Sequence, residues 1–270
     1  MTITATRPVG GLEVRLSSPR LGAEIFGFDL DTLTDADRDR LRALWDDRKV
    51  LVFRDAQLTP DQQVEAVRIF DEPFDHPTAV RHPDNRLVYP YEVQRTGKAS
   101  RWHIGGLWRD PVFSIESLVY EVVPDIGGDT IWADLQAAYD DLSDAFKELV
   151  GSVSAIYDGN AEHYAQGARR DGVTTTTEHP LVLEHPRTGR KGLFLSTGAI
   201  GLTGVDPREG DVLLRYLLEH ASAPQYQVRY GWRPGDFVLW DNQATWHFAV
   251  DDYGDAPRAY RKVIAAAAPA

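Results

Sequence analysis

The sequence predicts a mainly β fold with covering helices, arranged as a double-sheet jelly roll. Many short apolar segments are separated by Pro and Gly turns, and only a few segments have helical spacing. The chain has 270 residues, of which 43% are hydrophobic, so it can bury roughly three quarters of its extended surface. The sequence contains neither an internal repeat nor a long Gly, Ser or Pro linker, so we expect one domain over residues 1–270.

The first part of the chain mixes strands and helices. Apolar and polar residues alternate over 12–16, which predicts a half-buried strand. A capping sequence at 34–37 precedes apolar residues spaced for a helix face at 41–45. The β-branched run at 50–53 predicts a buried strand, and the Thr, Pro and Gln of 59–62 predict the start of a second helix.

After residue 80 the pattern is mostly typical of strands. One helix is expected from Ala133 to about Val150, and another begins at Asp206, where Asp, Pro and Glu repeat the capping pattern. The turn at 186–189 predicts a hairpin between its flanking apolar segments. The strands expected in this part cover 112–115, 118–123, 181–183, 193–195, 226–232 and 237–240.

Composition excludes several classes of function. The formal net charge of −12 argues against a nucleic-acid polymer as partner, but it permits a small anionic substrate held by a few local Arg residues. No apolar run reaches the length of a membrane span, and the start lacks the pattern of a signal peptide, so we expect a cytoplasmic protein. Because Cys is absent, any metal must be held by His, Asp or Glu.

Two histidines have neighbours that suggest chemistry. His103 precedes a Gly-Gly pair, and His247 follows a Trp-Asp-Asn run by a few residues. They are 144 residues apart in sequence, so only a closed β architecture would bring them together. On chemistry alone, a surface or core role for each histidine stays open.

Several segments in order along the chain identify a known family. They are 51–55 (LVFRD), 58–60 (LTP), 102–103 (WH), 124–132 (PDIGGDTIW), 137–139 (AAY), 142–143 (LS), 240–242 (WDN), His247 and 258–263 (RAYRKV). Together they resemble the taurine dioxygenase family of iron(II)- and 2-oxoglutarate-dependent oxygenases, from about residue 16 to 265. The resemblance implies a cupin-like jelly roll and a non-haem oxidoreductase that uses Fe(II), 2-oxoglutarate and O2.

The family's metal site consists of a His, a carboxylate two residues later, and a distant His. This facial set leaves three positions open on the iron. The resemblance makes His103 and His247 the metal ligands and places the carboxylate position on Gly105. Glycine has no side chain and cannot be a ligand.

The leading hypothesis for Gly105 is a halogenase. Known halogenases of this broad superfamily replace the carboxylate with Gly or Ala, and chloride or bromide fills the position. Such an enzyme would chlorinate an unactivated carbon of a free, small, anionic molecule, for example a nucleotide or an amino or carboxylic acid.

Gly105 is also compatible with alternatives to a halogenase, and these stay open. The chain could be a hydroxylase with an Asp-to-Gly change at position 105, or a non-catalytic binding protein on the same fold. Another carboxylate could also substitute, although Asp110 would have to fold back past Trp108 to do so. A glycine pair at 105–106 is also typical of a simple bend.

The resemblance also implies residues that bind the small molecules. Thr130 and Arg261 are expected to bind 2-oxoglutarate, since an Arg fork answers a carboxylate with two hydrogen bonds. Arg258 and His76 are expected to contact the substrate. Without the resemblance, a solvated arginine and a strand-start hydroxyl would explain Arg261 and Thr130 equally well. A homo-oligomer is left open.

Overall fold

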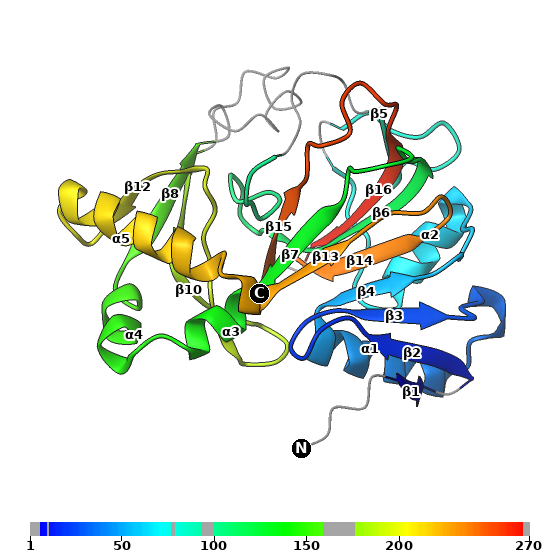
Figure 1. Ribbon diagram of the computed structural model, residues 1–270, viewed down its shortest axis with the longest axis horizontal. Helices are drawn as coiled ribbons and strands as arrows, with labels where there is room; N and C mark the ends of the chain where they lie inside the picture. Colours follow the sequence, from blue (N-terminus) through cyan, green and yellow to red (C-terminus); the bar gives the residue numbers. More distant parts are fainter. Residues whose placement is uncertain (1–5, 10, 77–78, 93–99, 159–175, 267–270) are drawn as a thin grey trace.

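The structure is a computed structural model that describes residues 6–9, 11–76, 79–92, 100–158 and 176–266 (Figure 1). Its strands are β1 (Thr6–Val9), β2 (Leu12–Leu16), β3 (Ala23–Phe26), β4 (Val50–Phe53), β5 (Tyr89–Glu92), β6 (Phe113–Val122), β7 (Thr130–Asp134), β8 (Ser154–Asp158), β9 (Thr176–Pro180), β10 (Val182–Glu184), β11 (Lys191–Leu193), β12 (Ala199–Thr203), β13 (Gln227–Tyr230), β14 (Phe237–Asp241), β15 (Thr245–Ala249) and β16 (Ala259–Ala266). The mainly β fold with covering helices is therefore confirmed.

The helices lie on the two sides of the strands. They are α1 (Asp35–Arg48), α2 (Pro60–Arg68), α3 (Leu135–Asp140), α4 (Asp144–Val150) and α5 (Pro207–Ala221). Figure 1 shows α1 and α2 beside the first four strands, and α4 and α5 at the opposite end beside β8 and β12. In the described part of the chain, no helix combines the length and apolar character needed to cross a membrane.

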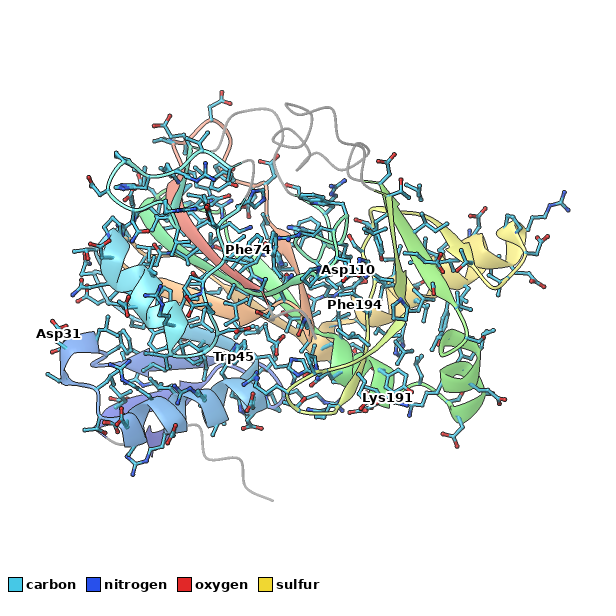
Figure 2. The ribbon with its side chains drawn as sticks, turned by 180° about the vertical axis from the view of Figure 1, so that it is seen from behind. Asp31, Trp45, Phe74, Asp110, Lys191 and Phe194 are labelled. Atoms are coloured by element: carbon cyan, nitrogen blue, oxygen red, sulfur yellow. The ribbon has the colours of Figure 1, made fainter. Side chains whose placement is uncertain are left out.

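The larger sheet has the order β1-β2-β3-β4-β14-β6-β16-β5 among the described residues, and it is antiparallel except between β3 and β4. Its outer face packs under α1 and α2, where Phe53, Val119 and Leu239 share one core cluster with Trp45 of α1 (labelled in Figure 2) and Val67 of α2. Burying each such side chain contributes about 1.5–3 kcal/mol.

The inner face of the large sheet meets a three-stranded sheet of order β13-β7-β15, while β12-β8-β9 and β10-β11 form two further small sheets in the described residues. Leu118 and Trp240 from the large sheet pack there against Trp132 of β7 and against Trp232, which follows β13. Side chains alternate between the faces of a strand, so β6 sends Val119 to the helices and Leu118 inward. The two sheets form the sandwich of a jelly roll.

The helix starts follow the predicted capping chemistry. Thr34, Thr59 and Asp206 each cap a helix and form a reciprocal pair with the side chain three residues later. The hairpin of β10 and β11 also encloses the predicted turn at 186–189.

Two element boundaries differ from the sequence prediction. The single helix expected over 133–150 is two helices, because Asp134 and Ser143 each accept hydrogen bonds from backbone N–H groups and start a new helix. The strands expected at 112–115 and 118–123 form one continuous strand, β6, which pairs on both sides.

Candidate metal centre

His103 and His247 are neighbours in the fold. The two residues form an isolated antiparallel bridge in which each backbone N–H donates to the other's carbonyl oxygen at 2.9 Å. Their rings lie 4.0 Å apart between centroids, and both residues are buried. Pairing of β15 with β7 places His247 opposite Trp132, and the 101–103 segment runs beside β15. The structure thus brings together the two histidines singled out in the sequence.

Both imidazoles are neutral at pH 7. Burial lowers the pKa of His103 well below its ordinary value, and the nearby His247 lowers it further. Burial, with a smaller effect of Lys262, lowers the pKa of His247 to about 3. His103 Nδ1 lies 2.7 Å from the Arg101 carbonyl oxygen, so Nδ1 holds the proton and Nε2 keeps its lone pair. Neutral imidazole is the form that binds metals.

The backbone of Gly105 is fixed by the side chain of Asn242. Gly105 N–H donates to Asn242 Oδ1 at 3.1 Å, and Asn242 Nδ2 donates to the Gly105 carbonyl oxygen at 2.8 Å. The same Nδ2 donates to the Phe113 carbonyl oxygen at 3.0 Å. Sequence reasoning noted the Trp-Asp-Asn run but assigned it no such role.

A carboxylate fills the space beside Gly105. A Cβ atom built on Gly105 would lie 2.0 Å from Oε1 of Glu116, a residue of β6 that is only 2% exposed. Glu116 Oε2 lies 3.8 Å from His247 Nε2, and Oε1 accepts a hydrogen bond from Lys262 Nζ at 2.6 Å. Sequence reasoning missed Glu116, although it and Glu121 are charged residues inside the otherwise mostly apolar run of 112–123.

Lys262 and His76 are two further titratable residues close to Glu116. Burial opposes the charge on Lys262, yet the Glu116 carboxylate raises the pKa of its ammonium group above the ordinary value. Burial, then the charges of Lys262 and Arg109, lower the pKa of His76 to about 4. The ring of His76 also contacts Phe113, so the structure places this predicted substrate contact within electrostatic reach of Lys262.

Thr130 and Arg258 contact the aromatic side chains between the two sheets of the sandwich. Thr130 Oγ1 accepts a hydrogen bond from Trp232 Nε1 at 2.9 Å, and the Trp232 ring packs 4.1 Å from that of Tyr120. The Arg258 guanidinium stacks over the Tyr120 ring at 4.9 Å and over Tyr253 at 5.3 Å. Arg258 is 6% exposed, and its Nε atom has no hydrogen-bond partner among the described residues.

Arg261, which the resemblance pairs with Thr130 for 2-oxoglutarate, lies on the α2 side of β16. Its guanidinium donates to the Leu58 carbonyl oxygen at 2.6 Å and lies 3.1 Å from the Glu121 carboxylate. Successive side chains of a strand point to opposite faces, so Lys262 points inward and Arg261 points toward the α2 side. Arg258 stacks on Tyr120, whose ring packs against the Trp232 that donates to Thr130.

The side chains at this site are of the types that bind a non-haem iron ion, but their donor atoms do not surround a single position. In the described ranges, no three His, Asp or Glu side chains form a metal-binding group as they stand. His103, His247 and Glu116 lie together, and two imidazoles with a carboxylate are the ligands that iron(II) oxygenases use. Asp110 (labelled in Figure 2), the other carboxylate considered from the sequence, raises the pKa values of Arg109 and His179 against the larger lowering by burial.

Comparisons with known proteins identify the family of this chain. The family model described as "Taurine catabolism dioxygenase TauD, TfdA family" matches residues 13–264. An alkylsulfatase of Acinetobacter baylyi is 31% identical, over 98% of this chain and 88% of the relative. An (S)-phenoxypropionate/alpha-ketoglutarate-dioxygenase of Sphingobium herbicidovorans is 32% identical, over 85% of this chain and 86% of the relative.

A solved structure shows the same fold. The crystal structure of a taurine dioxygenase from Burkholderia xenovorans superposes with a TM-score of 0.84 at 30% identity, covering 97% of this chain and 90% of that one. The matches span nearly all of the described strands and helices. The chain therefore belongs to the TauD, TfdA family of non-haem iron(II)- and 2-oxoglutarate-dependent oxidoreductases.

Proposed function

We propose that this protein is an iron(II)- and 2-oxoglutarate-dependent dioxygenase that oxidises a small anionic organic molecule. One observation favours this function over halogenation. The Glu116 carboxylate occupies the space beside Gly105, where the halogenase hypothesis needs room for chloride or bromide. A second anion so close to a buried carboxylate would be strongly repelled. The relatives' dioxygenase names also favour this alternative over the halogenase hypothesis.

The cationic side chains of the interior support an anionic substrate. Arg109 stacks over the rings of Phe74, at 4.3 Å, and Phe113, and its Nη1 atom is buried without a hydrogen-bond partner among the described residues. Phe74 lies beside β16, the strand that holds Lys262 (Figure 2). The charges of Arg109 and Lys262 both act on His76, and the two cations suit a sulfate ester, a sulfonate or an aryloxy carboxylate.

The same reasoning assigns the cofactor's residues. We propose that Arg258 and Thr130 hold a carboxylate of 2-oxoglutarate. The buried Arg258 guanidinium has an Nε donor without a partner among the described residues, and the rings of Tyr120 and Trp232 connect it to the Thr130 hydroxyl. His103 and His247 would hold the iron, which supplies the oxygen chemistry when bound. The large buried rings of Trp132 and Trp240 keep water from this interior.

Mass spectrometry of the reaction products tests the function. The protein is loaded anaerobically with Fe(II), 2-oxoglutarate and chloride, and oxygen is then added with an alkyl sulfate, an alkanesulfonate or an aryloxypropionate. The expected result is succinate formed in step with substrate oxidation, seen as a gain of one oxygen or as release of sulfate, sulfite or the phenol. A chlorine isotope pattern would establish halogenation instead, and unchanged 2-oxoglutarate with every substrate would indicate a binding protein.

A pair of arginine variants tests the cofactor assignment. Arg258→Lys should weaken 2-oxoglutarate binding by about tenfold, because an ammonium group cannot reproduce two parallel hydrogen bonds. Arg261→Lys is the matched control, three residues further along the chain on the α2 side of β16, and should leave the affinity unchanged. Calorimetry with the Mn(II)-loaded protein measures both constants. A larger effect at Arg261 would restore the assignment expected from the sequence.

A further inference from the structure

We propose that Glu116 is the third protein ligand of the metal centre, in the role that the family pattern gives to residue 105. The carboxylate comes from β6 instead of from the segment that follows His103. The proposal rests on the proposed function, because it concerns the same iron site. The juxtaposition of the Glu116 carboxylate with Gly105 and His247 is its basis.

The distance between donor atoms is compatible with one shared ion. Glu116 Oε2 and His247 Nε2 are 3.8 Å apart, which is too long for a hydrogen bond. Adjacent donors of a facial set that each lie about 2.1 Å from the ion are about 3.0 Å apart, so an approach of about 0.8 Å would let both atoms bind one ion.

Gly105 is explained by the space that Glu116 needs. The Gly105 backbone is outside the left-handed region, whereas the neighbouring Gly106 has a φ of 78° that favours glycine. Backbone conformation therefore does not demand glycine at position 105. A Cβ there would lie 2.0 Å from Oε1 and 2.5 Å from Cδ of Glu116, so even alanine would displace the carboxylate. The space between residues 105 and 116 therefore holds one carboxylate group, which here belongs to Glu116.

The charge balance at Glu116 also points to a cation. The side chain is 2% exposed, and a buried carboxylate is stable only when its charge is compensated. Lys262 is bound to Oε1, while Oε2 is directed toward the His247 ring. A divalent ion held by the two imidazoles and Oε2 would place its charge on the oxygen that Lys262 does not bind.

Metal affinity, measured without turnover, tests the proposal. Calorimetry gives the dissociation constant for Mn(II) in the presence of N-oxalylglycine, an unreactive analogue of 2-oxoglutarate, and the electron paramagnetic resonance of bound Mn(II) gives a second readout. Glu116→Gln should weaken Mn(II) binding by at least about tenfold, because the amide keeps the shape and removes the charge. Asp134→Asn, which removes a buried carboxylate paired with Lys49, is the matched control and should keep the native affinity. Equal Mn(II) affinity in Glu116→Gln and the native protein would overturn the proposal.

Two further variants keep the test decisive if Glu116→Gln folds poorly. Gly105→Ala should also weaken Mn(II) binding, because its Cβ would push the Glu116 carboxylate aside. Gly201→Ala is its control, since no atom lies within 4 Å of that added Cβ. Gly105→Asp combined with Glu116→Ala should recover most of the affinity by moving the carboxylate to position 105. Native affinity in Gly105→Ala would contradict the proposal.

The result also separates this proposal from the proposed function. If the native protein binds no Mn(II) with N-oxalylglycine, both are wrong. If the native protein binds Mn(II) and Glu116→Gln binds it equally well, the oxygenase site stands and only the ligand role of Glu116 is wrong.

Discussion

Two buried lysine–carboxylate pairs in this fold have different uses. Lys49 Nζ lies 2.9 Å from Asp134 Oδ2, and both side chains are 2% exposed. Lys262 Nζ lies 2.6 Å from Glu116 Oε1, where the lysine is 21% exposed and the glutamate 2%. The second oxygen of Asp134 accepts from two backbone N–H groups and caps α3. The second oxygen of Glu116 faces His247.

The difference teaches how to distinguish a structural pair from a candidate ligand. All the acceptor capacity of Asp134 is used within the fold, so this pair joins α1 to the start of α3 and needs nothing else. Glu116 is only partly used by Lys262 and lies beside two neutral imidazoles. The surroundings of the second carboxylate oxygen, and not burial alone, therefore distinguish a candidate metal ligand from a structural carboxylate.

The largest effect on stability should come from breaking the structural pair. Lys49→Met leaves Asp134 buried without its cation, which costs about 3–5 kcal/mol of unfolding free energy. Urea unfolding followed by circular dichroism measures the loss. Added Mn(II) should not restore it, because Asp134 is paired away from the histidines. A loss below about 1 kcal/mol, the value typical of exposed pairs, would mean that the pair of Lys49 and Asp134 is not a structural element of the fold.

Breaking the second pair should cost less and should respond to metal. Lys262→Met leaves Glu116 without its ammonium partner, and we expect a loss of about 2 kcal/mol because Lys262 is partly exposed. Mn(II) with N-oxalylglycine should raise the melting temperature of Lys262→Met more than that of the native protein, since without the ammonium group the ion alone compensates the charge of Glu116. Equal shifts in both proteins would argue against contact between Glu116 and the metal.

The sequence predicted the parts of this molecule that local patterns specify. Capping residues such as Thr59 located the helix starts, because their hydrogen bonds lie within three residues. The break between α3 and α4 was missed, because the apolar side of 133–150 continues across it. The motifs around His103 and His247 identified the pair although long-range strand pairing brings them together.

The rest of the site depends on contacts that the sequence does not display. Arg258 and Arg261 are both arginines in one short segment, and only the strand's orientation shows which one faces the interior. Glu116 lies on β6 and Gly105 lies outside that strand, so only the three-dimensional structure shows that a side chain at position 105 would collide with Glu116. A single sequence therefore suggested an open metal position where the fold places a carboxylate.

Acid should destabilise the region of the second pair. The folded pKa of His76 is about 4, below its ordinary value of 6.5, so the folded state favours the neutral ring. This contribution is complete above pH 6.5 and is lost as the pH falls through 4, because the unfolded chain takes up the proton first. We expect a loss on the order of 2 kcal/mol from His76 across that interval. Urea unfolding at several pH values measures the slope, and His76→Gln should reduce it; an unchanged slope would contradict the prediction.

The smallest effect should come from an exposed pair at the other end of α3. Arg190 donates to Asp140 at 2.9 Å, with 45% and 55% of the side chains exposed. Water already solvates both groups, so Arg190→Gln should change the unfolding free energy by less than about 1 kcal/mol. Urea unfolding in low and high salt measures this, and the small difference should vanish at high salt. Asp134 and Asp140 bound the same helix, so a loss at Arg190 as large as that at Lys49 would show that helix docking, not burial, sets the strength of both pairs.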